Sequence, residues 1–144
     1  KDYSNLFSYK RLNISITGDD YYVLTDEKWS GYILSQILSN AVKYSPDRGE
    51  ISIITDRVGN ETTISISNKG RGILQKDIGQ IFNKGYTSSQ NRDGMKATGY
   101  GLYISNKLSH MLGHRLEVES KYNQYTIFSL VFIDSDTMHN VTKM

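Results

Sequence analysis

The stretch QILSNAVKYS, residues 36–45, carries two patterns at once. Its apolar residues recur at the spacing of an amphipathic helix that buries one face. Positions i, i+4, i+7 and i+8 of a helix fall within an arc of roughly 100°, so a second set of side chains shares a neighbouring face. That set is Gln36, Asn40, Lys43 and Tyr44. Exposure to solvent is a sufficient explanation for one polar residue on such a face. For four of them together, the other motifs of the chain must also be considered.

Composition limits the possible functions. The chain has 144 residues, which predicts one domain over 1–144. A net charge of +2 without a basic stripe argues against a nucleic-acid partner. The sequence has no cysteine, which excludes thiolate metal sites and fits a reducing compartment. No apolar run approaches the roughly 20 residues of a membrane span, and no signal peptide opens the chain. The first residue is Lys1, so we expect a piece of a longer protein with any span outside it.

Hydrophobic periodicity predicts an α+β fold. Alternating patterns predict strands at 11–17, 21–26, 50–55, 62–67, 114–120 and 124–133. Helices are expected from Asp26 to about Tyr44, over 76–82, and from the 99–101 step to a stop at Gly113. In the last of these, the apolar residues at helical spacing are Ile104, Leu108, Met111 and Leu112. The expected architecture is a two-layer sandwich, with a mixed, mostly antiparallel sheet and helices on one face.

Two further segments have no apolar period. Residues 83–99 are rich in Gly, Ser, Asn and Lys, and a loop of that length in a compact domain is usually a lid or a binding loop. Residues 134–144 form a polar tail. We therefore expect a flexible lid over 83–99.

Two glycine pairs flank this loop, in NKGRGI (68–73) and GYGL (99–102). Glycine allows tight turns and close approach of the backbone to a ligand. The second pair opens a helix, whose free N–H groups and positive dipole end suit a phosphate. A third glycine of a dinucleotide fingerprint is missing, and no strand precedes the pair. The sequence thus predicts a binding site for a polyphosphate.

The order of these motifs resembles the ATP-binding catalytic domain of bacterial sensor histidine kinases, which shares its Bergerat fold with gyrase, MutL and heat-shock chaperone ATPases (the GHKL family). QILSNAVKYS is similar to the N box, and SNKGRGI (67–73) to the first glycine box. IFNKGYT (81–87) resembles the phenylalanine box, and ATGYGLYIS (97–105) the second glycine box. The segment NQYTIF (123–128) also resembles the corresponding segment of Gram-positive kinases that sense peptide antibiotics together with an ABC transporter.

The resemblance implies ATP and Mg²⁺ as cofactors and assigns roles to the N box. Asn40 is the implied Mg²⁺ ligand, with Gln36 beside it. Lys43 would face the phosphates and Tyr44 the adenine or ribose.

The other boxes supply the remaining implied nucleotide-binding residues. The glycines 70 and 72 would pass close to the base, and those at 99 and 101 would hold the triphosphate. Thr126 would lie behind the adenine. Lys84 would reach the terminal phosphate or, alternatively, is an exposed lid lysine. The full implied set outside the N box is Asn68, Gly70, Gly72, Ile73, Lys84, Thr98, Gly99, Gly101, Leu102 and Thr126.

Two positions depart from the family pattern. Asn68 stands where the family has an adenine-recognising aspartate, so an amide oxygen replaces a charged acceptor at a cost of about 1 kcal/mol. Gln36 stands where gyrase-type and chaperone-type ATPases have a glutamate that activates water. Glutamine cannot take that proton, which argues against an ATP hydrolase. A degenerate, non-enzymatic nucleotide-binding or interaction module is the remaining alternative, supported by Asn68.

The expected function is transfer of the γ-phosphoryl group of Mg·ATP to a histidine on another domain. His110, His114 and His139 lack an adjacent carboxylate to act as base, so the acceptor is expected outside this chain. His110 and His114 are instead expected to be cations near a helix C-terminus. The implied partners are a histidine-bearing dimerisation domain, a response regulator and, by the narrower resemblance, an ABC transporter. The implied location is a cytoplasmic domain of a membrane-anchored parent.

Overall fold

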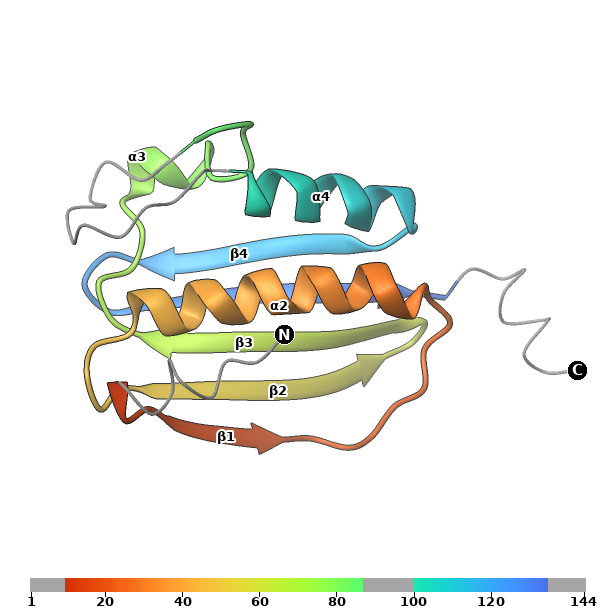
Figure 1. Cartoon of the computed structure of the whole chain (residues 1–144). Helices are drawn as coiled ribbons and strands as arrows, with labels where there is room; N and C mark the ends of the chain where they lie inside the picture. The colour runs from red at the N-terminus through yellow and green to blue at the C-terminus, as the bar shows by residue number, and fades with distance from the viewer. Residues whose placement is uncertain (1–9, 87–99, 135–144) are drawn as a thin grey trace, which may run out of the picture.

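The computed structural model describes residues 10–86 and 100–134. Its strands are β1 (Asn13–Thr17), β2 (Glu50–Val58), β3 (Glu61–Lys69), β4 (Arg115–Lys121) and β5 (Tyr125–Ile133). Its helices are α2 (Glu27–Tyr44), α3 (Gln75–Ile78) and α4 (Gly101–Met111). The strands form one sheet in the order β1-β2-β3-β5-β4, in which β1 is parallel to β2 and the other pairs are antiparallel. Helices α2 and α4 cover one face (Figure 1), which confirms the predicted α+β sandwich.

Helix α2 begins and ends where its local sequence predicts. Asp26 is the N-cap and accepts a hydrogen bond from the backbone N–H of Trp29 at 2.9 Å. Ser45, the residue before the proline, is the C-cap in an extended conformation. The apolar face of the helix packs on the core, with Ile33, Ile37, Ala41 and Val42 buried and Leu34 and Leu38 partly buried.

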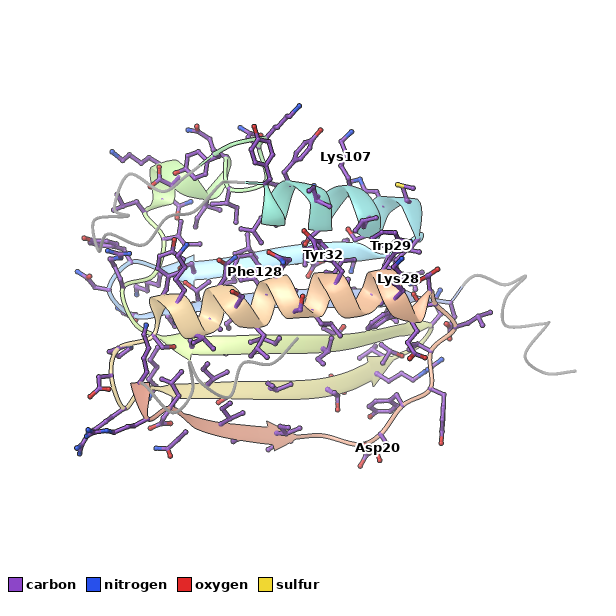
Figure 2. The ribbon with its side chains drawn as sticks, viewed as in Figure 1. Asp20, Lys28, Trp29, Tyr32, Lys107 and Phe128 are labelled. Carbon is purple, nitrogen blue, oxygen red and sulfur yellow. The ribbon has the colours of Figure 1, made fainter. Side chains whose placement is uncertain are left out.

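The covered face of the sheet is a stripe of alternate residues on β3 and β5, which we call the helix-facing stripe. Its cross-strand pairs are Thr62 with Phe132, Ile64 with Leu130, Ile66 with Phe128 and Asn68 with Thr126. Phe128 lies in the core beside α2 (Figure 2). The last pair continues the same alternation but is polar, and both of its side chains are buried. The hydrophobic pattern of the sheet therefore ends in a buried polar pair.

Residues 21–26 were expected to form a strand, and this prediction is wrong. The segment has no regular structure, and Tyr22 is 95% exposed. Strand β1 already pairs with β2, so the chain after it leaves the sheet edge and crosses to the helix layer. At the end of that crossing Thr25 hydrogen-bonds Ser30 and His114, each at 2.8 Å, and so holds the start of α2.

His114 was expected to be a cation, which the structure contradicts. The side chain is 5% exposed and packs its ring edge-on against Phe132. Its Nδ1 accepts a hydrogen bond from the backbone N–H of Ile133, and its Nε2 lies 2.8 Å from the Thr25 hydroxyl. Because Nδ1 is an acceptor, the ring is neutral with its proton on Nε2. Burial lowers the pKa of His114. A backbone hydrogen bond at Gly113 and the negative charge of Asp134 act in the opposite direction and offset part of this shift.

The apolar face expected for α4 is only partly buried. Met111 is 80% and Ile104 is 39% exposed, whereas Ser105 and Ser109 are fully buried. Leu108 and Leu112 do pack against the core. The residues that α4 buries completely are thus two small serines. The prediction from helical spacing, which placed Ile104 and Met111 on the buried face, is wrong for these two residues. The predicted stop is confirmed, since Gly113 has a φ of +76° just beyond the last turn.

The segment 76–82, expected to be a short amphipathic helix, is helical only at its start. Helix α3 ends at Ile78, with Gly79 as its C-cap, and turns follow. Ile81 is nevertheless buried, so the apolar spacing reflects packing rather than a continuous helix. In the part of the chain that the structure describes, no helix combines the length and hydropathy needed to cross a membrane.

Candidate functional site

A cavity of about 210 Å³ lies at the polar end of the helix-facing stripe. Its walls come from the C-terminal half of α2, the N-terminus of α4, the glycine segment after β3, the residues after α3, and β5. The lining residues are Gln36, Ser39, Asn40, Ala41, Lys43, Tyr44, Asn68, Arg71, Gly72, Ile73, Ile81, Tyr86, Gly101, Leu102, Thr126 and Phe128.

The polar face of α2 lies entirely along this cavity. Gln36, Asn40, Lys43 and Tyr44 all line it, so the arc seen in the sequence is one wall of the cavity. The Lys43 ammonium lies 5.4 Å from the centroid of the Tyr44 ring. Burial lowers the pKa of Lys43, which a bound anion would oppose.

Lys10, which the sequence did not single out, holds the end of this wall. Its ammonium donates hydrogen bonds to the carbonyls of Val42, Lys43 and Ser45, at 2.8 to 2.9 Å. The last carbonyls of a helix have no partner inside the helix, and a cation there also suits the helix dipole. The turn that carries Lys43 and Tyr44 is therefore fixed from outside the helix.

Asn68 and Thr126 form the floor of the cavity. The Asn68 Nδ2 donates to the carbonyl of Lys69 at 3.3 Å, which leaves Oδ1 as the amide atom able to accept from a ligand. The Thr126 hydroxyl lies 2.8 Å from the hydroxyl of Ser120. This end of the cavity is polar but uncharged.

The N-terminus of α4 closes the opposite side. Gly101 and Leu102 line the cavity, and the N-cap Tyr100 makes no side-chain hydrogen bond to the helix. The first N–H groups of a helix have no acceptor inside it and lie at its positive end. A Cβ at position 101 would meet the Oε1 of Gln36, the end of a flexible side chain, so the start of α4 lies directly against this residue of α2.

The first glycine box turns sharply beside the floor. Gly72 lines the cavity with a φ of +71°, a conformation that disfavours side chains, and a Cβ there would collide with the Lys121 carbonyl. Gly70 does not line the cavity. A Cβ at position 70 would come 2.7 Å from the Tyr44 carbonyl, so this glycine lets β3 approach the end of α2.

Six lining residues were missed at the sequence level, among them Arg71 and Tyr86. The Arg71 guanidinium lies 5.5 Å from the Tyr44 ring centroid, so two cations flank that ring. Its place between the glycines of a ligand-facing turn was the signal that could have identified it. Burial raises the pKa of Tyr86, and the carboxyl group of Asp77 raises it further. Ser39, Ala41, Ile81 and Phe128 complete the unpredicted lining.

Besides Gly70, three predicted residues do not line the cavity or lie outside the described residues. Lys84 is exposed and is absent from the lining. Thr98 and Gly99 lie outside the described residues, as does the predicted lid beyond residue 86.

The lining carries two cations, Lys43 and Arg71, and no carboxylate among the residues that the structure describes. Together with the start of α4, these cations make one part of the cavity attractive to an anion. The floor offers uncharged hydrogen-bonding groups beside the apolar side chains of Ile73, Leu102 and Phe128. The lining suits a ligand that combines a weakly polar group with an anionic one.

Known proteins share both the sequence pattern and the fold. Residues 25–136 match the family described as histidine kinase-, DNA gyrase B-, and HSP90-like ATPase. Over 132 residues the chain is 37% identical to the sensor protein BceS of Bacillus subtilis (strain 168), covering 92% of the chain and 39% of that protein. It is 42% identical over 113 residues to the sensor protein kinase GraS of Staphylococcus aureus (strain JH1), covering 78% and 32%. The chain thus spans well under half the length of these curated relatives.

Solved structures agree on the fold. A mycobacterial sensor histidine kinase, MprB, superimposes with a TM-score of 0.79 at 20% identity, covering 90% of this chain and 89% of that one. The catalytic domain of histidine kinase ThkA superimposes with a TM-score of 0.76 at 20% identity, covering 91% and 86%.

Proposed function

The chain belongs to the histidine kinase-, DNA gyrase B-, and HSP90-like ATPase family, and from this membership we propose that it is the ATP-binding catalytic domain of a two-component sensor histidine kinase. The observation that carries the proposal is the lining of the cavity, which combines uncharged hydrogen-bonding groups on β3 and β5 with the cations Lys43 and Arg71. Adenine suits the first and a triphosphate the second.

The predicted residues have the following roles in this proposal. Asn68 and Thr126 bind the base, and Gly72, Ile73 and Leu102 pack around it. Tyr44 lies along the adenine or ribose. Lys43 and the start of α4 at Gly101 hold the phosphates. Gly70 shapes the turn, and Lys84, Thr98 and Gly99 stay in the proposed nucleotide-binding set.

The donor set fits a magnesium ion held chiefly by the nucleotide. Magnesium keeps several waters and accepts one or two protein oxygens together with substrate phosphates. Asn40 offers one amide oxygen to the cavity, and Gln36 lies one turn earlier on the same wall. When bound there, Mg²⁺ would neutralise phosphate charge. A site made only of protein carboxylates is not required.

Catalysis by this chain consists of positioning and charge neutralisation. Lys43, Arg71 and the first turn of α4 surround the phosphates with positive charge, and the floor fixes the base. Gln36 stands where an ATP hydrolase of this family needs a general base, and an amide does not take a proton. The γ-phosphoryl group is therefore delivered to a histidine instead of to water.

The acceptor histidine belongs to a dimerisation domain outside this chain, and a response regulator receives the phosphoryl group next. An ABC transporter partner and a membrane-anchored parent with this domain in the cytoplasm extend the proposal. They are supported by the resemblance to peptide-antibiotic-sensing kinases.

Calorimetric titration of Mg·ATP into the chain, with phosphate release followed in parallel, tests the proposal. We expect saturable binding, phosphate release at background, and no phosphoryl group on the chain itself. Gln36→Glu is expected to raise release slightly by supplying a base. Rapid turnover by the unaltered chain would place it among the hydrolases. Absence of nucleotide binding would leave a degenerate module.

A further inference from the structure

We propose that Ser120 is a positioning residue that sets base selectivity, favouring purines with a 6-amino group over those with a 6-oxo group. Ser120 lies on β4, opposite Thr126 of β5 in the sheet register, and does not line the cavity itself. The inference rests on the proposed nucleotide site, because it concerns which base the floor of that site accepts.

The hydrogen bonds of the Ser120 hydroxyl are fully determined. Its oxygen accepts from the backbone N–H of Ile73 at 2.8 Å. Its single proton goes to the carbonyl of Tyr125 at 2.7 Å, since a carbonyl can only accept. The third neighbour is the Thr126 hydroxyl at 2.8 Å. With the Ser120 proton already committed, Thr126 must be the donor in that contact.

The direction of this bond decides what Thr126 can offer a ligand. A hydroxyl has one proton and two lone pairs. Because the proton of Thr126 is directed at Ser120, only lone pairs remain for the cavity. Asn68, its partner across the strands, donates one of its two Nδ2 hydrogens to the Lys69 carbonyl and presents Oδ1 as an acceptor. Of the two floor residues, Thr126 is therefore the one whose hydrogen-bonding role Ser120 fixes as an acceptor.

A Thr126 hydroxyl that can only accept contributes to selecting the base by its edge. The exocyclic amine of adenine is a donor and pairs with an acceptor. The corresponding oxygen of hypoxanthine or guanine is an acceptor and would be left unpaired against lone pairs. Burying an unpaired polar group is costly, and sites built this way discriminate strongly between analogues.

A second hydroxyl pair shows why Ser120 is special. Ser65 and Ser129 also lie opposite each other, with their oxygens 2.8 Å apart, on the other face of the sheet. Either of these can be the donor, because no backbone group fixes their protons in the part of the chain that the structure describes. The contacts to Ile73 and Tyr125 are what orient the pair at the cavity.

Ser120→Ala removes the oxygen that receives the Thr126 proton. The Thr126 hydroxyl can then rotate and donate to a 6-oxo group. We expect the preference for Mg·ATP over Mg·ITP, measured as the ratio of dissociation constants, to fall about fivefold to tenfold. ITP is the suitable probe because hypoxanthine lacks the 2-amino group of guanine and adds no bulk.

The matched control is Ser65→Ala, which makes the same change in the other hydroxyl pair and should leave the ratio unchanged. Ser120→Cys keeps the shape of the side chain with a slightly larger and weaker acceptor and should shift the ratio in the same direction, which guards against a misfolded alanine variant. In a Thr126→Val background, Ser120→Ala should have no further effect on the ratio, because the hydroxyl that it orients is gone.

The outcomes separate the two proposals. If the unaltered chain prefers Mg·ATP and the ratio does not change in Ser120→Ala or Ser120→Cys, Ser120 does not set selectivity although the nucleotide site stands. An equal change in the Thr126→Val background would also overturn the inference. If the unaltered chain binds neither nucleotide, the proposed function fails, and the inference fails with it.

Discussion

The helix-facing stripe keeps the same strands, register and covering helices along its length, yet its two parts differ in chemistry. Away from the cavity, Ile66 pairs with Phe128 and Ile64 with Leu130, and these side chains pack under α2. We call this part, which finishes with the pair of Thr62 and Phe132, the apolar end. At the other end, the pair in the same register is Asn68 with Thr126, still buried but polar. The backbones of β3 and β5 keep the same pairing along the whole stripe. The cavity therefore differs from the core only in the side chains that the strands carry there.

Polar groups can be buried at that end because each makes a hydrogen bond within the fold. Asn68 donates one amide hydrogen to the Lys69 carbonyl, and the hydroxyls of Thr126 and Ser120 share a hydrogen bond. An unpaired buried polar group would cost about 1 to 3 kcal/mol. The Oδ1 of Asn68 is left as an acceptor for a ligand.

Truncation at the apolar end should have the largest effect, and on stability alone. Leu130 is fully buried, so Leu130→Ala is expected to destabilise the fold by about 2 to 5 kcal/mol. Urea denaturation measures this loss. Nucleotide affinity of the folded fraction should stay unchanged. A large loss of affinity in fully folded Leu130→Ala protein would show that the two ends are not independent.

Asn40→Ala probes the polar end and should show the opposite profile. Because the side chain faces the cavity and contributes little packing, we expect Mg-dependent nucleotide binding to weaken by about tenfold or more. The free energy of unfolding should change by less than about 0.5 kcal/mol. Calorimetry with and without Mg²⁺ measures the first quantity. Equal Mg·ATP affinity in the variant would remove Asn40 from the site.

Lys43→Ala should weaken binding of the triphosphate about tenfold and change adenosine binding little, since only the phosphates meet the ammonium. Lys28→Ala is the matched control. Lys28 lies over the Trp29 ring at the other end of α2 (Figure 2), 4.9 Å from its centroid, away from the cavity. Equal losses for adenosine and ATP would show that Lys43 supports the helix instead of the phosphates.

Asn68→Asp sharpens the comparison by adding charge to the floor. A carboxylate accepts more strongly than an amide, so ATP should bind roughly fivefold to tenfold more tightly. Mg·GTP should remain a poor ligand for both forms. Tight ATP binding by the unaltered chain with no gain in Asn68→Asp would mean that residue 68 does not contact the base.

The smallest expected effect is a pH dependence at His114, outside both ends of the stripe. Its folded-state pKa is lowered by burial from an ordinary value of about 6.5, so the unfolded chain binds protons first as pH falls. The contribution of His114 to the free energy of unfolding should be complete above that ordinary pKa. Below it, the free energy of unfolding should fall by less than about 1.4 kcal/mol per pH unit. Urea denaturation between pH 7.5 and 5.5 measures the slope, which His114→Asn should reduce.

The features that the sequence predicted correctly depend on local chemistry. The start of α2 follows from the Asp26 cap, its end from Pro46, and the hairpin of β2 and β3 from the turn at Gly59. The N-box face was also readable, because helical spacing alone brings its four side chains to one wall.

The errors concern contacts between distant segments. Nothing near His114 in the sequence reveals that Thr25 and Ile133 engage both ring nitrogens. Segment 21–26 alternates like a strand, but the sheet edge beside it is already formed by β1. Arg71 reaches Tyr44 only because the glycine turn brings β3 to the end of α2. Long-range packing decided each of these cases.

The measurement that tests the division of the stripe most directly is the titration of Mg·ADP into isotope-labelled protein, followed by backbone amide chemical shifts. Residues of the polar end and its walls, namely Asn40, Lys43, Asn68, Gly101 and Thr126, should shift and saturate together with one dissociation constant. Ile64 and Leu130 at the apolar end should shift little. Saturable shifts centred on another surface, or no saturable shift at millimolar Mg·ADP, would contradict a nucleotide site at the polar end.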